Sequence, residues 1–97
     1  MNQAQIIYEL VSQIPKGKVS TYGILAQKAG IKSPRLVGKL LHNNPDPVSI
    51  PCHRVVNARG EVARSFAFGG SSAQRQKLED EGLIFQNNRI DIVKYLY

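Results

Sequence analysis

The sequence predicts a mainly helical domain with small β-hairpins, a winged-helix-like arrangement that contains a helix-turn-helix. Two patterns support this fold class. Apolar residues recur at helical spacing in three segments between residues 3 and 43, and Gly30 lies in the short turn between the second and third segments. Farther along, Ala58-Arg59-Gly60 separates two short segments with β-branched residues, which predicts a hairpin beside the helices. A chain of 97 residues suits a single domain over residues 1–97.

Local signals set the ends of the first three helices, which we expect over residues 3–14, 21–29 and 34–43. Pro15 and the residues after it end the first helix. Ser20 is a good N-cap for the second helix, and Gly30 suits a left-handed C-cap at its end. Ser33-Pro34 places a capping residue before a proline at the first helical position, which fixes the start of the third helix.

The second half of the chain predicts two hairpins separated by a loop and a helix. Strands are expected at 54–57 and 61–63, a loop at 64–70, a helix at 71–81, and strands at 83–85 and 90–93. Ser71 and Gln74 have capping-box spacing at the start of that helix, and Gly82 follows its end. The helix is mostly polar, so we expect it on the surface, held by Ala73 and Leu78.

Residues on one face of the third helix form a basic stripe. Arg35, Gly38, Lys39 and His42 recur at intervals of three and four residues, which puts them on one exposed face. Gly38 leaves the backbone bare there, and a glycine inside a helix costs up to about 1 kcal/mol relative to alanine. The stripe is suited to lie against DNA; the alternative is an ordinary solvated helix face.

Composition and charge limit the classes of function. Thirteen Lys and Arg against seven Asp and Glu give a net charge of +6 and a pI near 9.8, which favours a polyanionic partner, nucleic acid ahead of an anionic membrane surface. No apolar run approaches the roughly 20 residues of a membrane span. One cysteine and two histidines are too few for a structural zinc site, so we expect no metal. We expect a monomer in a reducing cytosol, with a free thiol.

The only cysteine lies in Ile50-Pro51-Cys52-His53-Arg54-Val55-Val56, next to a histidine and an arginine. A lone cysteine is more often a small buried hydrophobic residue. A neighbouring base or cation can instead favour the thiolate and make it a nucleophile. A carboxylate would also be needed to orient the imidazole. Spacing alone does not rank the candidates, which are Asp46, Glu79, Asp80 and Glu81.

This segment resembles the active-site signature of the O6-alkylguanine-DNA alkyltransferases, which transfer an alkyl group from guanine to their own cysteine. The resemblance covers nearly the whole chain. The segment from Ile14 to Gly23, read as Ile-Pro-Lys-Gly-Lys-Val-Ser-Thr-Tyr-Gly, is similar to the entry of the family's helix-turn-helix. Asn44-Pro45 precedes the cysteine at the family's spacing, and Glu81-Gly82 matches its late Glu-Gly.

The resemblance implies catalytic roles. Cys52 would accept the alkyl group, His53 would remove its proton through a water, Glu81 would orient the imidazole, and Asn44 would support the loop that carries the cysteine. No metal or organic cofactor would be required.

It also implies a DNA interface, with the second helix of the motif in the minor groove. Arg35 would replace the flipped nucleotide in the base stack, and Tyr22 would meet the base and its phosphate. Further DNA contacts are expected from Ser20, Thr21, Gly38, Lys39 and Arg54. The family's loop tyrosine has no clear counterpart. Ser65, Phe66 and Phe68 are the candidates to line the base pocket, and simple packing of the rings is the alternative.

Two departures from the family pattern bear on function. Typical members have an additional N-terminal domain, whereas this chain begins almost at the DNA-binding domain. In addition, the loop after Gly60 and the helix from Gln74 to Gly82 resemble the alkyltransferase-like proteins, compact relatives that flip and hold alkylated guanine without repairing it. Those relatives have tryptophan or another residue in place of the cysteine.

Three hypotheses follow. The first is a repair protein that flips O6-alkylguanine out of duplex DNA and transfers the alkyl group irreversibly to Cys52. The second is a non-enzymatic protein that binds the lesion and signals to another repair pathway through a protein partner. The third, an ordinary winged-helix regulator, accounts for the charge and the helices but not for the Cys-His-Arg sequence.

Overall fold

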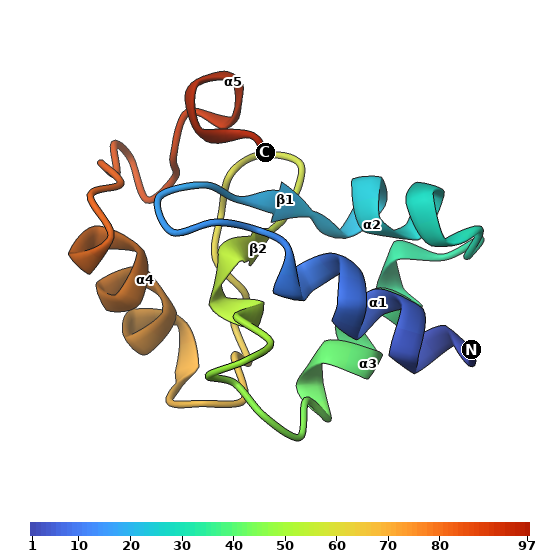
Figure 1. Ribbon diagram of the computed structural model, residues 1–97. Helices are drawn as coiled ribbons and strands as arrows, with labels where there is room; N and C mark the ends of the chain where they lie inside the picture. The colour runs from blue at the N-terminus through green and yellow to red at the C-terminus, as the bar shows by residue number, and fades with distance from the viewer.

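The structure, a computed structural model, describes residues Met1 to Tyr97 and is mainly helical. Figure 1 shows α1, α2 and α3 grouped on one side of a short strand pair, β1 and β2, with α4 on the other side. The elements are α1 (Gln3–Ser12), β1 (Ser20–Thr21), α2 (Tyr22–Ala29), α3 (Pro34–His42), the 3-10 helix η1 (Cys52–Arg54), β2 (Val55–Val56), α4 (Gly70–Asp80) and α5 (Ile92–Tyr95). None of the helices combines the length and apolar character needed to span a bilayer.

The first three helices confirm the prediction of a helix-turn-helix packed on a preceding helix. Their apolar faces meet in one core, to which Ile7, Val11, Leu25, Val37 and Leu41 contribute. The Tyr8 hydroxyl adds a link by donating to the Leu40 carbonyl at 2.8 Å. The shared core fixes α3 relative to α1 and α2, so its opposite face is presented to the outside in one orientation.

The ends of these helices agree with the predicted signals except at two N-caps. Gly30 adopts the predicted left-handed conformation, with φ of 69°. Pro34 begins α3 after Ser33, although the Ser33 side chain makes no capping bond. The N-cap of α2 is Thr21 rather than Ser20: its Oγ1 accepts from Ile24 N at 3.1 Å.

The predicted first hairpin is wrong, because β2 pairs with β1 and not with residues 61–63. The two strands are parallel, with Ser20 opposite Val55. Val55 and Val56 are fully buried, and parallel pairing with β1 places them between the helical core and a second core. Residues 57–61 form a tight loop instead of a ladder, because Asn57 Oδ1 accepts from both Arg59 N and Glu61 N at 2.9 Å.

The predicted second hairpin is also corrected. It shrinks to one antiparallel bridge between Gln86 and Arg89, around two asparagines with positive φ. Residues 92–95 are helical because the Asp91 side chain accepts from Val93 N and Lys94 N and caps α5.

The α4 helix forms where predicted, but Gln74 has a different role from the predicted capping box. Gly69 is the N-cap of α4, without a side-chain capping bond. The Gln74 side chain is fully buried: Nε2 donates to the carbonyls of His53 and Val55 at 3.1 and 2.9 Å, and Oε1 accepts from Ala63 N at 2.8 Å. Gln74 thus joins α4 to the segment that follows Cys52.

We predict that Gln74→Ala lowers the free energy of unfolding by about 3 kcal/mol, since it leaves one buried and two half-buried backbone groups without this partner. Gln76→Ala is the matched control, because the Gln76 side chain is exposed and bonds only to Asp80 on the same helix. It should change stability by about 0.5 kcal/mol or less. Urea unfolding curves provide the comparison, and equal midpoints for the two variants would contradict this role for Gln74.

Candidate active site

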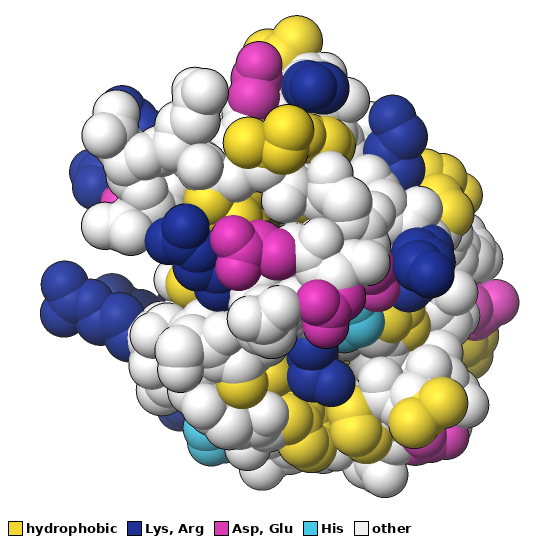
Figure 2. Space-filling view, turned by 90° about the vertical axis from the view of Figure 1, so that its left-hand side faces the viewer, with side chains coloured by type: hydrophobic (Ala, Val, Ile, Leu, Met, Phe, Trp, Pro, Cys, Tyr) yellow, Lys and Arg dark blue, Asp and Glu magenta, His cyan; other side chains and the backbone are white.

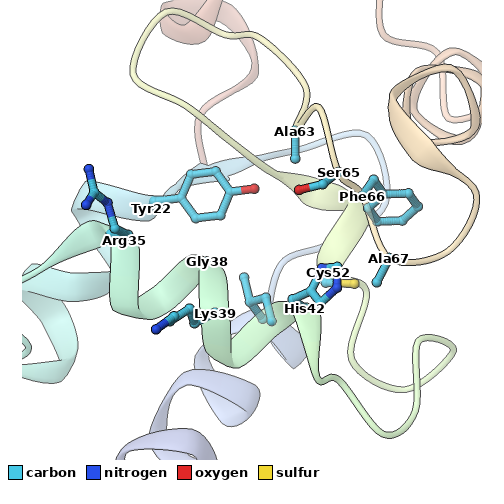
Figure 3. Close-up of a pocket in the computed structure, with 11 residues that line it drawn as sticks. Tyr22, Arg35, Gly38, Lys39, His42, Cys52, Ala63, Ser65, Phe66 and Ala67 are labelled. Carbon is cyan, nitrogen blue, oxygen red and sulfur yellow. The ribbon is translucent and has the colours of Figure 1, made fainter.

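A cavity of about 400 Å³ opens between α3 and the loop at residues 63–67, and Cys52 lies in its lining. Figure 3 shows the Tyr22 hydroxyl pointing across the cavity toward Ser65, with Arg35 at the opposite end of α3 from His42 and Cys52. The lining residues are Tyr22, Arg35, Gly38, Lys39, Leu41, His42, Cys52, Ala63, Ser65, Phe66 and Ala67. The exposed face of α3 and the only cysteine therefore share one cavity.

The Glu81 carboxylate ties His53 and Arg54 together beside this cavity. His53 Nε2 lies 2.7 Å from Glu81 Oε2. Arg54 binds the same carboxylate with Nε at 3.0 Å from Oε1 and Nη2 at 2.9 Å from Oε2. Its Nη1 donates to the Ile14 carbonyl at 2.8 Å, and Gly17 N donates to Glu81 Oε1 at 3.3 Å. The cluster therefore joins the end of α4, η1 and the turn after α1.

The protonation states of this cluster follow from burial and hydrogen bonding. Burial acts to raise the pKa of Glu81, but hydrogen bonds from Arg54 and His53 outweigh it and lower the pKa from 4.5 to about 2. Burial lowers the pKa of His53 below 6.5, even though Glu81 acts in the opposite direction. At neutral pH a neutral imidazole therefore faces an ionised carboxylate. Nε2 must carry the proton to donate to Glu81, which leaves Nδ1 as a free acceptor.

Cys52 is held as a buried thiol. Only 6% of its surface is exposed, and burial raises its pKa above 9.0, although a hydrogen bond with Asn44 acts in the opposite direction. Asn44 is itself buried; its Nδ2 donates to the Ile50 carbonyl at 2.7 Å and its Oδ1 accepts from Asp46 N at 2.9 Å. No hydrogen bond joins the thiol to the His53 ring. The Cys52 thiol and the His53 ring are therefore neighbours in the chain without direct hydrogen bonding between them.

The structure brings together only some of the residues predicted for the DNA interface. Tyr22, Arg35, Gly38 and Lys39 line the cavity. The Tyr22 ring lies over Gly38, where an added Cβ would be 3.8 Å from Tyr22 Cε1. This is an ordinary contact distance, so packing inside the protein does not require glycine at position 38.

Three residues predicted to contact DNA have side chains that are largely covered in this structure, and their contacts with DNA stay predictions. Ser20 and Thr21 are 3% and 6% exposed in β1, and the Thr21 hydroxyl caps α2. Arg54 is held by Glu81 and Ile14, with 16% of its side chain exposed. The Thr21 and Arg54 side chains are thus used within the fold, and the Ser20 side chain is buried.

Ser65 and Phe66 line the cavity, whereas Phe68 does not. Phe68 packs against the helical core and meets the Phe66 ring edge-on at 5.7 Å between centroids. Leu41, Ala63 and Ala67 also line the cavity and were not predicted. Their small or apolar side chains give no sequence signal, because their place depends on how the loop folds back over α3.

The fold and the cavity together define a helix-turn-helix domain with a buried cysteine beside its second helix. The family model described as 6-O-methylguanine DNA methyltransferase, DNA binding domain, matches residues 2–83. The chain belongs to this family.

The chain resembles both kinds of protein in this family. It is 34% identical to alkyltransferase-like protein 1 of Schizosaccharomyces pombe, over 94% of this chain and 90% of that protein. It is 42% identical to a DNA base-flipping protein of Vibrio parahaemolyticus, over 92% of this chain and 89% of that protein. A methylated-DNA–protein-cysteine methyltransferase of Cricetulus griseus is 35% identical over 81% of this chain, but the match spans 38% of that protein.

The chain also resembles solved structures of proteins from this family. The crystal structure of S. pombe Atl1 in complex with damaged DNA containing O6-carboxymethylguanine superposes with a TM-score of 0.86 and 31% identity, covering 98% of this chain and 94% of that chain. A Mycobacterium tuberculosis OGT in complex with DNA superposes with a TM-score of 0.75 and 30% identity, covering 84% of this chain and 50% of that chain.

The lowered pKa of Glu81 predicts how the stability of the protein depends on pH. Because its pKa in the folded protein is about 2, against 4.5 ordinarily, the ionised carboxylate stabilises the fold above pH 4.5, and this contribution is lost as the pH falls from 4.5 to 2. Glu81→Gln should lower the free energy of unfolding by about 3 kcal/mol at pH 7. The difference from the unaltered protein should shrink below pH 4.5 in urea unfolding curves.

Glu79→Gln is the control, since the Glu79 side chain is 40% exposed on the same helix and its pair with Arg75 is 3.5 Å long. It should change stability by about 0.5 kcal/mol or less. A Glu81→Gln loss that stays constant from pH 7 to pH 3 would show that the carboxylate is not held ionised.

Proposed function

We propose that this protein binds O6-alkylguanine in duplex DNA, takes the base out of the duplex into the cavity beside α3, and transfers the alkyl group to Cys52. The observation that supports this most is that Cys52 lies in the lining of a cavity shared with the exposed face of α3. The residue after Cys52 is His53, which is neutral and paired with Glu81. A base inside a duplex is out of reach of such a buried thiol, so the nucleotide must be rotated out before reaction.

Binding would begin with phosphate contacts from exposed cations, which attract any DNA sequence. Arg35 and Lys39 lie on the face of α3 that lines the cavity, and neither side chain has a hydrogen-bond or ion-pair partner within the protein. Arg35 would occupy the space that the rotated nucleotide leaves in the stack. Gly38 between them lets the backbone of α3 approach the DNA closely.

Transfer would be a single in-line displacement. The Cys52 thiol gives its proton through a water to Nδ1 of His53, the sulfur forms a bond to the alkyl carbon, and the bond from that carbon to O6 breaks. Glu81 stabilises the imidazolium that forms. The guanine leaves with an extra electron pair and needs a hydrogen-bond donor. The Tyr22 hydroxyl lines the cavity and stays protonated, since burial raises its pKa above 10.0.

No external acceptor or cofactor enters this scheme. The thioether on Cys52 is stable, and nothing in the scheme restores the thiol. Each molecule would therefore react once and remain alkylated.

A second candidate function is lesion binding without transfer, in which the protein holds the alkylated base and a separate repair pathway removes it. Two observations favour it. Two relatives that match over about nine-tenths of their own length are an alkyltransferase-like protein and a DNA base-flipping protein. In addition, burial raises the pKa of Cys52 and so disfavours the thiolate.

The two functions are separated by the mass of the protein after reaction. Incubation with a duplex that contains O6-methylguanine should add one methyl group, and peptide mapping should place it on Cys52. Cys52→Ser should bind the same duplex and gain no mass. Tight and selective binding without a mass gain on the unaltered protein would rule out transfer and leave the second candidate.

A further inference from the structure

A second and larger cavity adjoins the one that contains Cys52. It measures about 950 Å³ and lies between the helix-turn-helix and the loop at residues 57–64. Tyr22, Arg35, Gly38 and Ala63 line both cavities, so the two meet along this boundary. Cys52, His53 and Glu81 do not line the larger cavity, so the proposed alkyl acceptor lies outside it.

This larger cavity forms a groove between α3 and residues 57–64, and the charge of the groove is mainly positive. Arg35, Arg59 and Arg64 line it, against the single carboxylate of Glu61. Asn57 Nδ2 donates to Glu61 Oε1 at 2.9 Å, which holds that carboxylate against the loop. In contrast, acidic and basic side chains lie close together on the face formed by α4, as Figure 2 shows. An excess of cations is therefore a feature of the groove and not of every face.

The guanidinium groups of Arg59 and Arg64 have no partner inside the protein. Both residues are exposed, and neither side chain makes a hydrogen bond or ion pair. Arg54 and Arg75 differ, because Glu81 holds the first and Glu79 and Asn88 hold the second. Unpaired arginines that converge on one groove suit an external anion such as phosphate, because the planar guanidinium group can donate two hydrogen bonds to it at once.

The loop that carries these arginines is held in place by its own contacts. Besides the bonds of Asn57, Gly60 accepts from Ile90 N at 3.0 Å. Gly60 has φ of 85°, and an added Cβ would lie 2.3 Å from the Ile90 carbonyl oxygen. At the far end, Ala63 N is bound by Gln74. A fixed loop binds an anion without first losing conformational freedom.

We infer that the groove between α3 and residues 57–64 binds the sugar–phosphate backbone of the duplex beside the lesion, with Arg59 and Arg64 as its phosphate contacts. The inference rests on the proposed function, because the shared boundary at Arg35 and Tyr22 places the groove next to the point where a rotated base would leave the duplex. The small residues Gly23, Gly38 and Ala58 in its lining allow a backbone to approach closely. Residues 57–64 would thus act as the wing of this domain, as a rigid loop rather than a hairpin.

The test is the salt dependence of binding to a fluorescent duplex, measured by anisotropy for undamaged DNA and for the same duplex with one O6-methylguanine. Neutralising the two contacts in Arg59→Gln/Arg64→Gln should make the slope of log K against log salt shallower by about 1.8, since each phosphate contact contributes about 0.9. Affinity should fall by the same factor on both duplexes, so the preference for the lesion should be retained.

Lys16→Gln/Lys18→Gln is the matched control. It removes the same charge from two exposed lysines in the turn after α1, which line neither cavity. If the arginine variant and this control have the same slope, net charge explains the effect and the groove assignment is wrong. A loss of lesion preference without a change on undamaged DNA would also overturn it, by placing the loop in the base pocket. If the unaltered protein shows no preference for the lesion, the proposed function fails, whereas the slopes on undamaged DNA still test the groove.

Discussion

The structure depends on one half-buried carboxylate, that of Glu81, shared between His53 and Arg54. It lies at the end of α4 and receives hydrogen bonds from the segment that carries Cys52 and from the turn after α1. Arg54 supplies the charge that keeps Glu81 ionised in a largely buried place, and the ionised Glu81 in turn fixes the His53 ring. Removing any one of the three groups would leave a half-buried polar group without its partner.

The two small hydrophobic cores hold in place the elements that carry this cluster. The helical core fixes α3, the second core fixes α4, and the parallel pair β1 and β2 joins them through Val55 and Val56. Because η1 immediately precedes β2, Cys52 and His53 lie at the junction of the two cores. The two cores thereby bring the exposed face of α3 and the Cys52 thiol to one cavity. Contacts between residues far apart in the sequence produce this arrangement.

Local signals made the helices predictable, whereas the sequence did not predict the contacts between distant segments. Helical periodicity, Gly30 and Pro34 placed α1 to α3 nearly correctly. The pairing of β2 with β1 instead of residues 61–63 depends on where the cores form, which a hairpin pattern does not encode. Gln74 has the spacing of a capping box, but its side chain points inward. Its amide forms hydrogen bonds with the backbone groups of Ala63, His53 and Val55.

The candidate site was predicted in part, and chiefly from the family resemblance. Spacing could not choose between Asp46, Glu79, Asp80 and Glu81; the resemblance indicated Glu81, and the structure places that residue 2.7 Å from His53. The cation in the triplet was read as a DNA contact, yet Arg54 is used inside the cluster. Arg59 and Arg64 were not predicted as DNA contacts, because the sequence placed them in separate elements, a hairpin turn at residues 58–60 and a loop at residues 64–70.

The proposed role of His53 as a base requires that Glu81 hold it as a neutral ring with its second nitrogen free. The direct measurement is a long-range nitrogen–proton correlation NMR spectrum of the imidazole rings at pH 7, with the two histidines assigned by means of His42→Gln. The structure predicts that His53 carries its proton on Nε2 and has an unprotonated Nδ1. A doubly protonated ring, or a ring protonated on Nδ1 alone, would contradict it.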